Sequence, residues 1–169
     1  KFMLVAAANP CKCGYLSDPS RACSKAPACG EDYMSRVSGP LRDRFDLRID
    51  VPPVGYTDLD LPPSAEGSAH VAQRVLAARC RQHDRFAGHP TATLNADAEG
   101  GLLEQIATPD TEARALLSRA AERFHLSARG YHRVLRVART IADLEGVTDV
   151  RKPHLAEALS FRLPSMALA

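Results

Sequence analysis

The sequence FDLRIDV at residues 45–51 alternates strictly between apolar and charged side chains. A period of two is typical of a β-strand that has one covered face. Because a strand must hydrogen-bond to a neighbouring strand, this stretch restricts the fold to one that contains a sheet. We predict an α/β fold followed by an all-α part.

Arg44 precedes the alternating stretch and follows the turn-forming sequence Ser38-Gly39-Pro40. An arginine held at the end of a strand is well placed to bind a phosphate with its planar guanidinium. The alternative is an exposed arginine that pairs with Asp43 or Asp46.

A second strand is predicted at residues 2–8 (FMLVAAA), which are apolar without alternation, as in a central parallel strand buried on both faces. Asn9 follows at its carboxyl end, where ligands of open parallel sheets gather. Asn9 could position a water or contact a phosphate, or it could simply start the turn before Pro10. Since the apolar run is short for a signal peptide and Lys1 is a poor n-region, we interpret this terminus as internal to a longer protein.

Four cysteines, at positions 11, 13, 23 and 29, lie within nineteen residues at the spacing C-x-C-x9-C-x5-C. Four thiolates can bind a tetrahedral Zn²⁺. Free thiols and redox chemistry are the alternatives. Disulfides are disfavoured because nothing else suggests secretion, and the fifth cysteine, Cys80, stands alone in a predicted helix.

Residues 52–68 contain four prolines and two glycines, and this composition predicts a connector between two units, with a boundary near residue 60. Apolar spacings of three and four then predict a bundle of five helices, at residues 69–86, 101–107, 109–124, 127–145 and 152–161. Thr108 is the expected cap of the third. The row formed by Arg74, Arg81 and Arg85 could contact a DNA backbone, or it could be a solvated helix face.

Arg129 lies in the first turn of the helix expected to start at Ser127. The positive end of the helix dipole disfavours a cation there, by roughly 0.3–1 kcal/mol. A guanidinium beside a helix amino end is nevertheless a good receptor for an anion. The alternative is a flexible surface arginine.

Composition adds few restrictions. The net charge of +2 is too small to indicate nucleic acid binding by itself, and with 5% aromatic residues and no tryptophan no base-stacking surface is indicated. No apolar stretch approaches the length needed to cross a bilayer, so we expect a cytoplasmic protein without a membrane partner.

The sequences VAAANPCKCGY, SGPLRDRFDLRIDVPPV, LSARGYHRVLRVARTIADLEG and HLAEALSFR, in this order, resemble the ComM (YifB) family of magnesium-chelatase-like AAA+ ATPases. The resemblance covers essentially all 169 residues and implies the C-terminal part of such a protein. It implies that residues 1–60 are the end of the AAA+ α/β core, and that residues 61–169 are the helical lid.

The resemblance also implies roles for single residues. Asn9 corresponds to sensor 1, Arg44 to the arginine finger that acts in trans, and Arg129 to sensor 2, which contacts the ATP phosphates. The family has an apolar residue at the position of Arg42. Family members carry a second C-x-C pair. In this chain Lys25 stands two residues after Cys23, where the second cysteine of that pair would be, and Cys29 comes later instead. This difference weakens the transfer of a zinc site from the family.

The sequence contains neither a G-x-x-x-x-G-K-[ST] phosphate loop nor an apolar strand ending in Asp-Glu. We therefore expect ATP and Mg²⁺ to be bound mainly by a missing N-terminal part, and this chain alone to be inactive. The resemblance implies a homo-hexamer that remodels DNA by branch migration or unwinding in recombination or natural transformation. Two alternatives are a magnesium-chelatase subunit acting on a porphyrin, and a non-enzymatic zinc-stabilised helical module that binds DNA or protein.

Overall fold

The computed structural model describes residues 2–16, 18, 20–62 and 65–162; the interpretation placed on Lys1 therefore falls outside the described residues. The chain divides into two compact units, Lys1–Phe45 and Asp46–Ala169, which are described one at a time. The predicted domain boundary near residue 60 stays a prediction.

The α/β prediction is wrong. Within the described ranges the chain is helical and has no strand, and its one β-type contact is an isolated parallel bridge between Pro109 and Val150. The apolar side chains of residues 2–8 face solvent, and so do those of Leu47, Ile49 and Val51, whereas Phe45 is half-buried; Phe2 is 89% exposed and Val51 is 85% exposed. A strand requires a neighbouring strand for its N–H and C=O groups, and neither segment pairs with one among the described residues.

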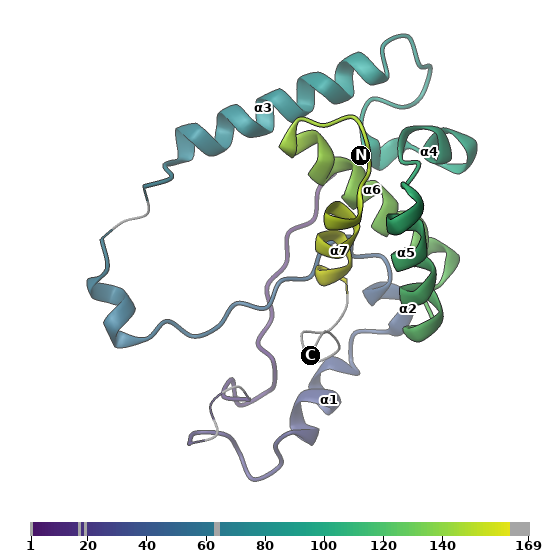
Figure 1. The fold of residues 1–169 in the computed structure, drawn as a ribbon. Coiled ribbons are helices and arrows are strands. Elements are labelled where there is room, and N and C mark those ends of the chain that lie inside the picture. Colours follow the sequence, from purple (N-terminus) through teal and green to yellow (C-terminus); the bar gives the residue numbers. More distant parts are fainter. Residues whose placement is uncertain (1, 17, 19, 63–64, 163–169) are drawn as a thin grey trace. The chain divides into compact units, whose positions relative to one another are not determined.

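The second unit is a bundle around α6 (Ala128–Glu145), which contacts α7 (Lys152–Ser160), α3 (Ser68–Arg85) and α4 (Gly100–Ile106) (Figure 1). Helix α5 (Thr111–Arg123) packs against α7. Two 3-10 turns, η1 (Tyr56–Asp60) and η2 (Asn95–Asp97), precede α3 and α4. The core residues are Phe86, Ala92, Ala98, Leu103, Ala107, Ala113, Leu117, Ala120, Val134, Leu135, Ala138, Val150, Leu155, Ala158 and Leu159.

The five predicted helices of this unit are confirmed, and so is the start and end of α6. The Ser127 side chain accepts a hydrogen bond from the Gly130 N–H, and Gly146 ends the helix in the left-handed conformation at φ +88°. The predicted start of α5 is wrong, because Asp110 caps that helix and Thr108 does not. Pro109 is held in the bridge to Val150, so the helix begins two residues later.

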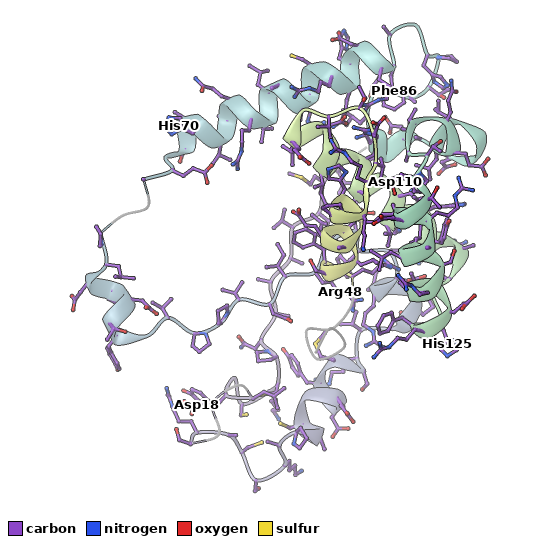
Figure 2. All side chains as sticks on the ribbon, in the orientation of Figure 1. Asp18, Arg48, His70, Phe86, Asp110 and His125 are labelled. Atoms are coloured by element: carbon purple, nitrogen blue, oxygen red, sulfur yellow. The ribbon has the colours of Figure 1, made fainter. Side chains whose placement is uncertain are left out.

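The start of the second unit is attached to the end of its bundle. The backbone N–H of Arg48 donates to the Phe161 carbonyl at 2.8 Å, and the Arg48 guanidinium donates to the Arg162 carbonyl. Figure 2 labels Arg48 beside the end of α7. Asp46 forms an ion pair with Arg133 on α6. These contacts fix residues 46–48 in a non-strand conformation.

The first unit contains two short helices, α1 (Ala28–Met34) and α2 (Gly39–Arg42). The Ser38 side chain caps α2 by accepting from the Leu41 N–H, and Pro40 lies in its first turn. Among the described residues of this unit only Cys11 and Gly30 are buried. The unit therefore has almost no apolar core.

Candidate functional site

Three of the four clustered cysteines come together in the first unit. The sulfurs of Cys11, Cys13 and Cys29 all lie within 4.8 Å of one another, and those of Cys11 and Cys13 are 3.1 Å apart. Cys11 is fully buried, whereas Cys13 and Cys29 are partly exposed. Each residue supplies one sulfur, so this trio has the donor type and the spacing of a metal site.

The backbone explains why these sulfurs meet. The Gly14 N–H donates to the Cys11 carbonyl at 3.1 Å and closes a tight turn, which Gly14 completes at φ +82°. Helix α1 brings Cys29 to this turn. A Cβ on Gly30 would lie 2.5 Å from the Leu16 side chain, so glycine is what allows α1 to approach the turn so closely.

The thiols of this cluster have strongly different acidities. The pKa of Cys13 is lowered to about 6, chiefly by the backbone N–H of Tyr15, then by the Cys11 thiol and the backbone of Cys23. The pKa of Cys29 is raised to about 12 by burial and then by the sulfurs of Cys23 and Cys11. The Cys13 thiol therefore ionises at a much lower pH than the Cys29 thiol.

The predicted nucleotide residues of the first unit are exposed. Asn9 lies in irregular chain, and Arg44 lies in the turn after α2, where its N–H donates to the Leu41 carbonyl at 3.0 Å. Arg44 does not stand at a strand entrance, because residues 45–51 form no strand. No ion pair joins Arg44 to another described residue, and Asp46, one predicted partner, is bound by Arg133.

Arg129 lies one residue inside α6, as predicted, and its side chain is exposed. In the described part of the chain no side-chain hydrogen bond or ion pair occupies its guanidinium. The next residue, Gly130, is buried under the guanidinium of Arg162. Arg129 and Arg44 belong to different units, so each is described by itself.

The arginine row on α3 is neither a free DNA-binding ridge nor a fully solvated face. Arg85 donates to both carboxylate oxygens of Asp143, and Arg81 donates to the Asp143 backbone carbonyl at 3.0 Å. Arg74 pairs with Glu66 at 2.8 Å. Two of the three guanidiniums therefore serve the packing of α3 on α6.

Sequence reasoning missed the buried charges on α6. Asp143 and Arg139 are 0% and 1% exposed, and they form an ion pair at 3.1 Å. Their i,i+4 spacing beside the apolar stripe was the available signal. Burial alone raises the pKa of Asp143, but hydrogen bonds from Arg85 and Asn95 and the charge of Arg139 outweigh it and lower that pKa below its ordinary value.

Two family models match the chain. Residues 65–162 match the model described as magnesium chelatase, subunit ChlI, C-terminal. Residues 1–59 match the model described as magnesium chelatase, subunit ChlI.

Curated relatives match nearly the whole chain. The competence protein ComM of Haemophilus influenzae is 39% identical over 163 residues, and the uncharacterized protein YifB of Escherichia coli is 37% identical over 164. The uncharacterized protein Rv2897c of Mycobacterium tuberculosis is 39% identical over 165 residues. Each match covers 96% of this chain but 31% of the relative, so the chain spans about a third of their length.

None of the helices in the described part of the chain has the length and apolar character required to span a membrane.

Proposed function

Because this chain belongs to the magnesium chelatase ChlI family, we propose that it is the C-terminal portion of a ComM-like AAA+ ATPase that couples ATP hydrolysis to DNA remodelling. The alignment of 96% of the chain with a competence protein supports the assignment to DNA uptake or recombination. In this proposal the protein is a cytoplasmic homo-hexamer. ATP and Mg²⁺ are bound mainly by residues outside the chain.

The observation that carries the proposal is the unpaired guanidinium of Arg129 in the first turn of α6. A cation at this position opposes the helix dipole, and no carboxylate among the described residues compensates for it. The position is therefore favourable only when an anion is present. In the proposed role of sensor 2, Arg129 contacts the ATP phosphates of its own subunit and couples lid movement to the nucleotide state.

Arg44 is proposed as the arginine finger, which acts on ATP bound by the neighbouring subunit. Phosphoryl transfer depends mainly on stabilising charge, and such a finger increases the rate by about 10³–10⁵. Its exposure at the turn after α2 supports this role, because a finger must project away from its own subunit. Asn9 is proposed as sensor 1, which orients the attacking water or contacts the γ-phosphate.

The test compares Arg44→Ala with Arg42→Ala in the full-length hexamer. Both arginines are exposed and two residues apart, so the second is a matched control for charge and local folding. We expect Arg44→Ala to reduce ATP turnover by at least about 10³ while ATP affinity stays nearly unchanged. Arg42→Ala should retain turnover. Loss of ATP binding in Arg44→Ala, or equal loss of turnover in both variants, would reject the trans role.

A second candidate function is that of a magnesium-chelatase subunit, which the descriptions of both matching family models favour. The two candidates predict different dependences of ATP hydrolysis. We expect a DNA-remodelling motor to hydrolyse ATP faster when DNA is added, and a chelatase subunit to do so when its porphyrin substrate is supplied. ATPase assays of the full-length protein with DNA and with a porphyrin-loaded chelatase complex discriminate between them.

A further inference from the structure

We propose that Cys11, Cys13, Cys23 and Cys29 bind one structural Zn²⁺ as a tetrathiolate site, with Cys23 as the fourth ligand, and that this ion takes the place of a hydrophobic core in the first unit. The proposal rests on the cysteine geometry and is independent of the ATPase reaction proposed above. It also assigns no catalytic role to the ion.

The distances fit the ion. In a tetrahedral site with Zn–S bonds of about 2.3 Å, neighbouring sulfurs lie about 3.8 Å apart. The sulfurs of Cys11 and Cys13 are 3.1 Å apart, and those of Cys11, Cys13 and Cys29 all lie within 4.8 Å of one another. Changes of up to about 1 Å in the sulfur–sulfur distances therefore convert the trio into three corners of a tetrahedron.

Cys23 is the thiol that can supply the fourth corner. It is the remaining cysteine of the first unit, and its side chain is partly buried like those of Cys13 and Cys29, although its sulfur lies outside the tight trio. The Ala26 N–H donates to the Cys23 backbone carbonyl at 3.0 Å, and this turn leads into α1, which carries Cys29. The fifth cysteine, Cys80, lies on α3 in the other unit and has no place in the site.

The composition of the first unit explains what the ion would do. In residues 2–16, 18 and 20–45 only Cys11 and Gly30 are buried, so apolar burial contributes little to the stability of this unit. Small units of this kind are usually held by a metal or by disulfides. The five cysteines are free thiols, and the 3.1 Å between Cys11 and Cys13 is well beyond a disulfide bond of about 2.05 Å.

The geometry also places the ligands on two separate parts of the unit. Cys11 and Cys13 lie on the turn closed by Gly14, whereas Cys29 lies on α1. A shared ion would therefore cross-link the turn to the helix, at the point where Gly30 already approaches Leu16. This is the arrangement in which binding energy for the metal becomes folding energy.

The experiment measures zinc in the protein purified without chelator, by elemental analysis, together with cobalt spectra after exchange. We expect about one zinc per chain, and on Co²⁺ substitution the intense visible bands and sulfur charge transfer of a tetrahedral tetrathiolate site. Cys23→Ser should lose most of the zinc and change the cobalt spectrum. Cys80→Ser is the matched control and should bind the same amount as the unsubstituted chain.

The folding of the second, helical unit is measured separately from zinc binding, because the four proposed ligands lie outside that unit. The far-ultraviolet circular dichroism of α3–α7 should be retained in Cys23→Ser, which distinguishes a lost site from an unfolded chain. A metal-free protein whose five thiols all react at similar rates would overturn the proposal. So would a Cys23→Ser variant that holds zinc as fully as Cys80→Ser, or isolation of the four cysteines as disulfides. None of these outcomes bears on the roles of Arg44 and Arg129.

Discussion

Arg85 on α3 binds both carboxylate oxygens of Asp143 on α6, through hydrogen bonds of 2.8 Å from Nη1 and 2.5 Å from Nη2. Asn95 donates to the same carboxylate at 2.8 Å. Of the residues of α3 only Ala78 and Gln82 are buried, and the apolar side chains of Val75 and Leu76 are exposed. The attachment of α3 to the bundle therefore depends on this polar network more than on apolar packing.

Arg85→Ala is expected to destabilise the protein by about 1.5–3 kcal/mol, because the buried Asp143 carboxylate loses its bidentate partner but keeps Asn95 and Arg139. Urea unfolding followed by circular dichroism measures the change. The control is Arg74→Ala on the same helix, whose partner Glu66 is 48% exposed and whose own side chain is 59% exposed. That variant should lose at most about 1 kcal/mol. Equal losses in the two variants would contradict the structural role of Arg85.

The stability of the helical unit is expected to fall at acidic pH in a way that depends on Arg85. The pKa of Asp143 is lower in the folded state than in the unfolded state. Its contribution to the free energy of unfolding is therefore fully present above the unfolded-state pKa of about 3.9, and it is lost as the pH falls through the folded-state pKa. Urea midpoints measured between about pH 3 and pH 7 test this. Arg85→Ala should show a shallower acid dependence, since its Asp143 pKa is less depressed. Parallel profiles would rule out Asp143 as the titrating group.

The helices of the second unit could be predicted from sequence because the features that determine them lie within a few residues of one another. The apolar spacing and the Ser127 and Gly146 signals at the ends of α6 act within a few residues. The strands could not be predicted in the same way. The alternation at residues 45–51 is compatible with a strand only where a neighbouring strand is available, and the described part of the chain contains none.

The candidate site was predictable in part for the same reason. The spacing of the cysteines indicated a cluster, and three of the four sulfurs do lie together. The i,i+4 spacing of Arg139 and Asp143 was a local signal for an ion pair, but it did not predict their burial, which depends on Arg85 and Asn95, 58 and 48 residues away from Asp143 in the chain. A charged residue beside an apolar stripe is usually solvated, so only the tertiary partners reveal its burial.

His125→Gly is expected to stabilise the protein by about 0.5–1 kcal/mol, because His125 holds a left-handed conformation at φ +49° that favours glycine. The Leu126 N–H donates to the Ala121 carbonyl at 3.0 Å, which is the bond of a Schellman motif after α5. Figure 2 labels His125 at this end of α5. Thermal or urea unfolding measures the gain.

The comparison for His125 is Gly146, which occupies the equivalent position after α6 with a bond of 3.0 Å from the Val147 N–H to the Ala142 carbonyl. Gly146→Ala should lower the free energy of unfolding by about 1 kcal/mol or more, since an alanine is strained at this positive φ and its Cβ would lie 3.0 Å from the Arg81 guanidinium. An unchanged free energy of unfolding in His125→Gly would mean that the left-handed conformation of His125 does not destabilise the protein.

The effect of Gly130→Ala on the free energy of unfolding is expected to depend, even in its sign, on the residue at position 162. Alanine is the better helix former by roughly 1 kcal/mol, but its Cβ would lie 3.0 Å from Nη2 and 3.2 Å from Nε of Arg162, whose side chain is buried. We therefore expect Gly130→Ala to destabilise the unsubstituted protein and to stabilise the Arg162→Ala variant. A double-mutant cycle by urea unfolding measures this coupling directly. An equal stabilisation in both backgrounds would mean that the Arg162 guanidinium moves aside freely, and that Gly130 is not required for its position.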